Sequence, residues 1–298
     1  MENKGILREV QLPQSDWSSL WQKIVLPKAI KDSLLGQVAL EFNLRGKFPR
    51  AAVPLHGIIL LAGPPGTGKT TICRGLASVA AEFLETNIRF VEVEPHSLTG
   101  SQLGKSQREV QTLFQEKLPE YAAQGPTIVL LDEVETLAID RNRLSLEANP
   151  VDVHRATDAV LASLDWLAEE HPQLLFLATS NFEGAIDPAF LSRADLIVRI
   201  EKPTREACES ILLDTLQTLA TRYERIGTLP SVPEWSSVVD EAVGLDGRQL
   251  RKAVLAACAL EKEVALDPNE LRIEHLRYAL RQMKVGVQRD GSQTEVIR

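Results

Sequence analysis

The sequence predicts an α/β domain with a parallel sheet, followed by a small domain made only of helices. Residues 56–201 alternate short apolar runs with segments of helical periodicity, which is typical of parallel strands joined by covering helices. A glycine-rich loop at 63–70 lies between the first apolar run and the first helical segment. After Pro203 only helical signals remain. The two patterns together indicate two domains of different class.

Composition places the chain among ordinary globular proteins. Its 298 residues carry a net charge of −8, with 44% hydrophobic and 25% charged residues. No apolar run approaches the roughly 20 residues that span a membrane. No signal-peptide core follows residues 1–5, so we expect a cytoplasmic protein without membrane contact. The acidic balance argues weakly against nucleic acid as a partner.

Three cysteines are widely spaced along the chain, at Cys73, Cys208 and Cys258. Their odd number and their spacing do not suit a disulfide framework or a zinc site. We expect reduced thiols that behave as small buried apolar residues.

An entry segment of the α/β domain is predicted over residues 1–55. Helical apolar spacing covers 16–24 and 28–42. Trp17 and Trp21 lie one helical turn apart and therefore on one face, which favours their docking this segment onto the domain.

The large domain, 56–201, is expected to hold five strands and the helices between them. Apolar runs predict strands at 56–62, 89–93, 127–131, 173–179 and 196–200. Helical spacing predicts helices at 71–79, 104–121 and 153–170.

The small helical domain is expected over 202–285, with a flexible polar tail at 286–298. Lys202 and Pro203 form the hinge that precedes it. Its helices are predicted at 204–223, 235–243, 246–266 and 272–284.

The glycine-rich loop matches G-x-x-x-x-G-K-[ST] in full, which is the phosphate-binding P-loop. Its glycines allow backbone N–H groups to converge on phosphate oxygens. Lys69 reaches the β- and γ-phosphates of ATP, and the Thr70 hydroxyl is offered to Mg²⁺. The helix that follows directs its positive end to the same phosphates. The residues predicted to bind the nucleotide here are Gly63, Pro64, Pro65, Gly66, Thr67, Gly68, Lys69, Thr70 and Thr71.

Two further strand ends carry polar groups suited to hydrolysis. The run 128–131 leads into Asp132 and Glu133, a Walker B pattern in which Asp132 holds Mg²⁺ and Glu133 activates the attacking water. Asn181 follows the strand at 173–179 and is placed to position that water. The structural alternatives are a polar strand terminus for the two acids and a turn cap for Asn181.

Asp132, Glu133, Asn181 and Arg193 occur in this order before a helical lid, and in this the chain resembles the AAA+ ATPases. The resemblance implies that Arg193 reaches the γ-phosphate of a neighbouring subunit, where it stabilises charge on the transferred group. A local salt bridge is the alternative for Arg193. The segment 244–252 resembles the sensor-2 region, which implies that Arg248, or else Arg251, contacts the nucleotide from within the same chain.

The resemblance narrows to the pachytene-checkpoint ATPases. It rests on 132–137, 141–143, 149–152, 155–161, 179–182 and 191–196, where a single Arg-Ala-Asp replaces a paired-arginine ending. It implies a homohexamer that pulls on the terminus of a HORMA-domain protein and converts it from the closed to the open state. Only about fifty residues precede the P-loop domain, which resembles the short bacterial version of the family. That version implies a HORMA protein bound to a cGAS-like nucleotidyltransferase in a cyclic-oligonucleotide antiphage (CBASS) system, whose signalling the ATPase restrains.

The same resemblance implies a substrate pore. Gln102, Leu103 and Gly104 occupy the place of the first pore loop, and 141–152 that of the second. Many relatives carry an aromatic residue where Gln102 stands. Because a buried leucine contributes only about 2 kcal/mol, we expect limited pulling on a loosely held segment. Plain loop residues are the alternative in both places.

Two other functions compete with remodelling. A nucleic-acid-acting AAA+ loader is disfavoured by the acidic balance, and an ATP-bound oligomeric scaffold is disfavoured by the presence of Glu133 and Arg193.

Overall fold

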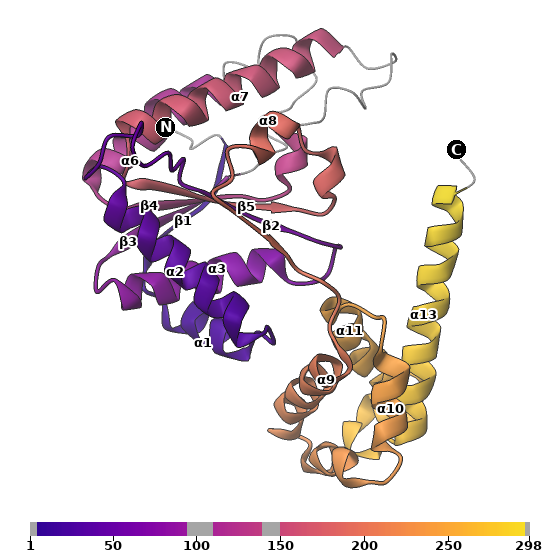
Figure 1. Cartoon of the computed structure of the whole chain (residues 1–298). Coiled ribbons are helices and arrows are strands. Elements are labelled where there is room, and N and C mark those ends of the chain that lie inside the picture. The colour runs from indigo at the N-terminus through magenta and orange to yellow at the C-terminus, as the bar shows by residue number, and fades with distance from the viewer. Residues whose placement is uncertain (1–4, 94–109, 139–149, 296–298) are drawn as a thin grey trace. The chain divides into compact units, whose positions relative to one another are not determined.

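The computed structural model describes the backbone of residues 5–93, 110–138 and 150–295, and the side chains of these ranges except 150–156 and 286–295 (Figure 1). The described contacts divide the chain into two compact units. Unit 1 contains the chain up to Pro64 together with Lys69–Ile200, and unit 2 contains Pro65–Gly68 together with the chain from Glu201 onward. Each unit is described below by itself.

Unit 1 is built on a six-stranded sheet with the order β1-β3-β4-β5-β2-β6. Its strands are β1 (Ile6–Leu12), β2 (Ile58–Ala62), β3 (Ile88–Val93), β4 (Thr127–Leu131), β5 (Leu174–Ser180) and β6 (Leu196–Arg199). The pairs β3–β4, β4–β5, β5–β2 and β2–β6 are all parallel. The five predicted strands are therefore confirmed, as is the α/β fold class.

The strand β1 was not predicted, and it is antiparallel to β3. Ile6 and Val10 are partly buried and Leu12 is fully buried, whereas the other four residues are exposed. Such a largely exposed edge strand lacks the continuous apolar run that marks the interior strands. The sheet is thus mixed, with one antiparallel strand added to a parallel core.

Helices cover both faces of this sheet (Figure 1). One face carries α1 (Ser15–Lys23), α2 (Lys28–Leu44) and α3 (Lys69–Phe83). The other carries α6 (Leu118–Gln124), α7 (Pro150–Glu170) and α8 (Pro188–Leu191). Single turns of 3₁₀ helix follow two of the strands, at η2 (Val134–Thr136) and η4 (Glu183–Ala185).

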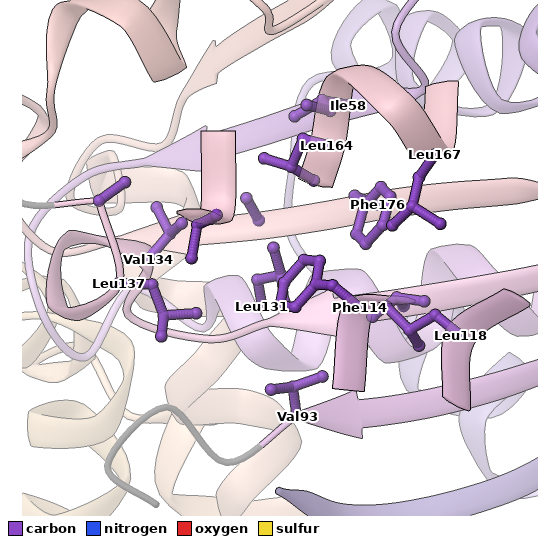
Figure 2. Packing of buried hydrophobic residues seen from close by; sticks show 14 of the residues in the cluster. Ile58, Val93, Phe114, Leu118, Leu131, Val134, Leu137, Leu164, Leu167 and Phe176 are labelled. Carbon is purple, nitrogen blue, oxygen red and sulfur yellow. The ribbon is translucent and has the colours of Figure 1, made fainter. Parts of the chain in front are cut away.

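The core of unit 1 has two layers because neighbouring strand residues point to opposite faces. In β2, Ile58 and Leu60 belong to the layer under α7, whereas Ile59 and Leu61 belong to the layer over α3. Figure 2 shows the first layer, where the rings of Phe114 and Phe176 stack with their centroids 6.3 Å apart. Burial on both faces explains why the interior strands are apolar at every position.

The two tryptophans of α1 dock the entry segment as predicted. Trp21 is buried, and its backbone passes 3.2 Å from the place a side chain on Gly75 of α3 would occupy. Trp17 meets the edge of Phe90, with ring centroids 4.9 Å apart. Close packing of α1 on α3 therefore depends on the absence of a side chain at Gly75.

The helix predicted over 104–121 is irregular where the structure describes it. A π-helical segment, η1 (Thr112–Lys117), leads directly into α6. Pro119 stands in the first turn of α6. Because proline cannot donate to the carbonyl four residues earlier and its ring crowds that group, the wider turn relieves a clash.

Unit 2 is helical. Its helices are α9 (Arg205–Ala220), η5 (Glu224–Ser231), α10 (Trp235–Ala242), α11 (Gly247–Cys258), α12 (Lys262–Leu266), η6 (Pro268–Glu270) and α13 (Ile273–Glu295). The single helix predicted over 246–266 is wrong, because the chain breaks between α11 and α12 at residues that include neither glycine nor proline. The predicted tail 286–298 is helical as far as Glu295, and its mobility stays a prediction.

Candidate nucleotide site

The polar residues predicted for hydrolysis meet at the carboxyl ends of three neighbouring strands. The parallel register pairs Ala62 of β2 with Ser180 of β5, and Leu131 of β4 with Ala178 of β5. The residues that follow each strand are therefore brought to one edge of the sheet, which is where α/β folds place their ligand sites. Lys69, Thr70, Asp132, Glu133 and Asn181 are joined there by hydrogen bonds.

The P-loop begins at a position that only glycine fits. Gly63 has φ 154°, and a Cβ atom there would lie 2.1 Å from the carbonyl oxygen of Ile200. Its N–H donates to the carbonyl of Ser180 over 3.1 Å. Gly66 and Gly68 also have positive φ, at 81° and 87°.

Lys69 is buried, and its ammonium group is fully engaged. It donates to the carbonyl oxygens of Gly63 and Pro64 over 2.8 and 2.9 Å, and to Oδ1 of Asn181 over 2.9 Å. Burial lowers the pKa of Lys69, and the nearby carboxylates of Glu135, Asp132 and Glu133 oppose that shift in this order. The ammonium is thus a charged group held by neutral oxygens, which an anionic phosphate would replace favourably.

Asp132 accepts two hydroxyl groups. Thr70 Oγ1 donates to its Oδ1 and Oδ2 over 2.9 and 3.1 Å, and Thr179 Oγ1 donates to Oδ1. A threonine hydroxyl beside a carboxylate at the end of a P-loop is an all-oxygen set, which fits the preference of Mg²⁺ for one or two protein oxygens plus phosphates and water. Thr179 was not predicted as a site residue, although its place one residue after Ala178 in the register already put it beside Asp132.

Glu133 stands in a left-handed backbone conformation, with φ 52° and ψ 53°. This conformation costs a non-glycine residue roughly 1–2 kcal/mol, and such strain gathers at functional sites. Its N–H donates to Thr179 Oγ1 over 3.1 Å, and its Oε1 accepts from Asn181 Nδ2 over 3.0 Å. Asn181 therefore bridges Lys69 and Glu133 through the two ends of one amide.

Glu135 is a site residue that the sequence analysis missed. Its Oε1 accepts the backbone N–H of Asn181 over 3.0 Å, while its Oε2 is buried without a hydrogen-bond partner among the described residues. Glu135 is also the largest of the negative charges acting on Lys69. The Asp-Glu-x-Glu spacing was visible in the sequence, but only the η2 turn shows that its last carboxylate returns to the site.

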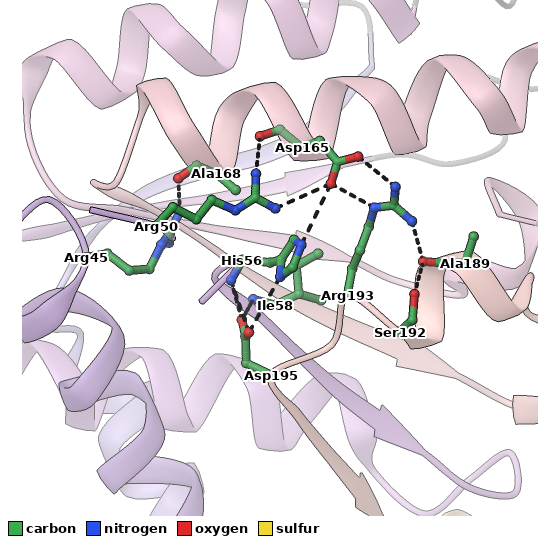
Figure 3. A network of polar contacts seen from close by, with 10 residues as sticks. All are labelled: Arg45, Arg50, His56, Ile58, Asp165, Ala168, Ala189, Ser192, Arg193 and Asp195. Carbon is green, nitrogen blue, oxygen red and sulfur yellow. Dashed lines mark hydrogen bonds and ion pairs between the residues drawn. The ribbon is translucent and has the colours of Figure 1, made fainter. Parts of the chain in front are cut away.

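Arg193 forms a salt bridge within its own chain (Figure 3). Its Nε and Nη2 donate to Oδ1 and Oδ2 of Asp165 in α7 over 2.9 and 2.6 Å, and its Nη1 donates to the carbonyl of Ala189 over 2.6 Å. The local partner considered from the sequence is thus present. Its identity was not predictable, because Asp165 lies 28 residues away on another element.

The aspartate of the Arg-Ala-Asp ending holds the start of a strand. Asp195 accepts the N–H groups of His56 and Ile58 over 3.0 and 2.9 Å (Figure 3). Burial alone would raise the pKa of Asp195, but hydrogen bonds from His56 and Ile58 bring it below its usual value. A second arginine at this position would lose both backbone contacts.

Buried charge continues along the amino ends of β2 and β5. Arg45 donates to the carbonyls of Leu174 and Ala168 and passes so close to Gly57 that a Cβ there would lie 1.9 Å from its Nη1. Its partner Glu41 is fully buried at 3.9 Å, and burial raises the pKa of Glu41 to about 7, with the charge of Asp195 adding to the shift. We call Glu41, Arg45, His56 and Asp195 the amino-end cluster.

Within unit 2, the contacts of the two candidate lid arginines differ. Arg251 Nη1 donates to Asp214 Oδ2 over 2.8 Å and to Thr215 Oγ1 over 3.2 Å. Arg248 begins α11, where Asp246 forms a capping box with Gln249, and its N–H lies 3.3 Å from the carbonyl of Gly66. The P-loop residues Pro65, Gly66, Thr67 and Gly68 group with this unit.

The predicted pore residues Gln102, Leu103 and Gly104 lie outside the described residues, as does most of 141–152. The three cysteines are free, and burial raises the pKa of each thiol. Among the described residues, no group of three or more His, Cys, Asp or Glu side chains is arranged to hold a metal. No described helix is long and apolar enough to cross a bilayer.

Comparisons with known proteins show the family of the chain. Residues 59–202 match the AAA family, the ATPase family associated with various cellular activities. The chain is 55% identical to the CD-NTase-associated protein 6 of Pseudomonas aeruginosa over 94% of this chain and 93% of that protein. It is 32% identical to the pachytene checkpoint protein 2 homolog of Danio rerio over 84% of this chain, and spans 64% of that longer protein.

A solved structure shares the fold of most of the chain. It is described as the HORMA:CdnC:Trip13 complex of E. coli MS115-1, with TM-score 0.76 and 19% identity over 94% of this chain and 95% of the compared chain. The family match and the similarity over almost the whole length of a relative lead to one conclusion. The chain belongs to the AAA ATPase family, together with the CD-NTase-associated protein 6 and the pachytene checkpoint protein 2 homologs, and it is a nucleotide-binding ATPase.

Proposed function

We propose that the protein hydrolyses Mg²⁺-bound ATP at the carboxyl ends of β2, β4 and β5. The P-loop from Gly63 to Thr71 would hold the phosphates, and Thr70 with Asp132 would hold Mg²⁺, which neutralises charge on the phosphates when bound. The observation that carries the proposal is the exchangeable set of contacts around Lys69. Its partners there are two backbone carbonyls and the Asn181 amide, none of which bears a charge.

In this mechanism Asn181 changes partners between states. In the structure its amide joins Lys69 to Glu133. When a γ-phosphate takes over Lys69, the Asn181 amide becomes available to orient the attacking water, and Glu133 becomes available to accept its proton. Glu135 holds the backbone of Asn181 in both states because it bonds the main chain rather than the side chain.

The proposed assembly is a homohexamer in which Arg193 acts on the neighbouring subunit's γ-phosphate. An arginine supplied in trans stabilises charge that develops in the transition state. In unit 2, Arg248 is the better candidate for a sensor than Arg251. Arg251 is already paired with Asp214, whereas the Arg248 side chain makes no hydrogen bond or ion pair with the described residues.

The proposed work is the opening of a closed HORMA-domain protein through a terminus drawn into the pore by Gln102, Leu103 and Gly104. The effect would be to separate that protein from a cGAS-like nucleotidyltransferase and so restrain CBASS signalling in the cytoplasm. Support comes from the name CD-NTase-associated protein 6 and from the HORMA:CdnC:Trip13 description of the structural neighbour.

The test combines ATPase and release measurements. Wild type and Glu133→Gln are mixed with a preformed complex of a HORMA-domain protein and its nucleotidyltransferase, and the free nucleotidyltransferase is measured by size-exclusion chromatography. We expect ATP-dependent release by wild type. Glu133→Gln should bind ATP but lose hydrolysis by a factor of about 10²–10⁴, as removal of a general base does, and should release nothing.

Other outcomes would redirect the assignment. Robust ATP hydrolysis without any release contradicts remodelling of this complex. Equal and negligible ATPase rates in both proteins would favour a scaffold, and salt-dependent stimulation by DNA would favour a loader.

A further inference from the structure

The salt bridge between Arg193 and Asp165 has a geometry that holds the Arg193 side chain in one orientation. It is bidentate and side-on, with both carboxylate oxygens engaged at 2.9 and 2.6 Å. Both side chains are partly exposed, at 21% for Arg193 and 38% for Asp165. A pair at such a surface contributes at most about 1 kcal/mol to stability, but its bidentate geometry fixes the orientation of the guanidinium plane.

The described contacts use three of the five N–H donors of the guanidinium group. An arginine side chain has five N–H donors in a rigid plane. Asp165 accepts from Nε and Nη2, and the Ala189 carbonyl accepts from Nη1. One N–H on each terminal nitrogen remains, and each can donate to a phosphate oxygen.

Asp165 also faces Arg50 and His56, but less closely. Arg50 Nη2 lies 3.5 Å from its Oδ1 and His56 Nε2 lies 3.8 Å away (Figure 3). The hydrogen bond from Arg193 is the first cause that holds the pKa of Asp165 below its usual value. The carboxylate is therefore charged and directed chiefly at Arg193, while Arg50 and His56 help to fix it.

The second support of Arg193 is local. The Ala189 carbonyl accepts both Arg193 Nη1 and Ser192 Oγ, over 2.6 and 3.0 Å, in the short helix α8. The side chain thus rests between α8 and α7. Because two elements hold it, a rotamer change of Arg193 requires the loss of both contacts.

We propose that Asp165 is a positioning residue that presents the Arg193 guanidinium to the neighbouring subunit's nucleotide. The inference rests on the proposed trans role of Arg193. Asp165 touches no nucleotide, and it acts by fixing the plane of a long side chain before the subunits meet. Loss of such positioning lowers kcat and leaves the KM for ATP unchanged, because ATP is bound by the other subunit's own P-loop.

A double-mutant cycle tests whether Asp165 acts through Arg193. Asp165→Ala should lower kcat about tenfold, and Arg193→Ala by more. In the Arg193→Ala background, Asp165→Ala should change kcat by less than about twofold. Asp165→Glu keeps the carboxylate and should recover part of the rate. Additive losses, or a rise in kcat for Asp165→Ala, would overturn the proposal, since a rise means that Asp165 restrains the arginine.

Mixed assemblies separate this inference from the proposed function. Arg193→Ala subunits retain Glu133, and Glu133→Gln subunits retain Arg193, so their mixture should be more active than either protein alone. The mixture of Asp165→Ala with Glu133→Gln should show the same gain. A gain in the first mixture without one in the second refutes the positioning role of Asp165 and leaves the trans role of Arg193 standing. No gain in the first mixture refutes the trans role of Arg193 itself.

A matched ion pair controls for general effects of losing a carboxylate. Glu241 in unit 2 accepts Arg281 Nε and Nη2 over 2.9 and 2.6 Å, the same distances as in the pair of Asp165. Glu241→Gln should leave kcat unchanged. If Asp165→Ala lowers the melting temperature far more than Glu241→Gln does, Asp165→Asn takes the place of Asp165→Ala in the double-mutant cycle. If Asp165→Asn then lowers kcat in the Arg193→Ala background as well, a positioning role is contradicted.

Discussion

The two ends of the same parallel strands carry charged clusters of different character. At the carboxyl ends, Lys69, Asn181 and Glu133 bond one another through side chains that a ligand can displace. At the amino ends, Arg45 and Asp195 bond backbone carbonyls and N–H groups of β2 and β5. A nucleotide can replace the hydrogen bonds within the first cluster. The second cluster is hydrogen-bonded to backbone groups of the fold, which no ligand replaces. Burial of charge therefore does not by itself mark a functional site in this protein.

The largest expected effect separates the clusters most clearly. Lys69→Ala should reduce ATPase activity by a factor of about 10³ or more, because it removes the charge that we propose contacts the transferred phosphate. The free energy of unfolding should change little, since burial disfavours the charged form of Lys69 in the folded protein. Binding of a fluorescent ATP analogue and thermal unfolding measure the two quantities. A large loss of stability with nucleotide binding intact would break the comparison.

Arg45→Met should have the opposite effects, with a large loss of stability and little loss of nucleotide binding. It removes the donor to Leu174 and Ala168 and leaves Glu41 buried without its cation, which costs about 3–5 kcal/mol of unfolding free energy. Urea unfolding measures this loss. The variant that remains folded should still bind the ATP analogue, and loss of binding at native-like stability would contradict the separation of the two ends.

Glu41 gives the amino-end cluster a dependence on pH. Its pKa in the folded protein is about 7 against an ordinary value of 4.5, so the folded state binds the proton more tightly. The resulting stability, at most about 3 kcal/mol, is fully present below the ordinary pKa and is lost as pH rises through 7. The urea concentration at the unfolding midpoint should decrease as the pH is raised from 5.5 to 8. Glu41→Gln should reduce this dependence of the midpoint on pH. An unchanged slope in the variant would assign the dependence to another group.

The smallest expected effect concerns the lid arginines. Arg248→Ala should weaken ATP turnover by about tenfold if it supplies one charge-assisted contact to the nucleotide. Arg251→Ala, which loses the partly exposed contacts with Asp214 and Thr215, should change turnover by less than about twofold. Steady-state ATPase assays distinguish them, and the reverse order would assign the sensor to Arg251.

Most of the fold and half of the site followed from local sequence patterns. The interior strands and the P-loop were predictable because their signals lie within a few contiguous residues. The pairing of Arg193 with Asp165 and the contact of Glu135 with Asn181 were not, because they join residues 28 and 46 positions apart. Such contacts depend on how helices seat on the sheet, which periodicity does not encode. The break after α11 likewise has no marker in its residue types.

The antiparallel strand β1 has a consequence for assembly. It pairs along the whole of β3, from Ile88 to Val93, and so covers the outer hydrogen-bonding edge of the parallel core. An open edge of that kind recruits strands from other molecules and leads to aggregation. A protein proposed to work as a closed ring needs its subunits to meet through defined faces alone. Because β1 is then the edge of the sheet, a second copy of the chain would meet its exposed, charged residues Arg8 and Glu9, which oppose strand pairing, and not the backbone of β3.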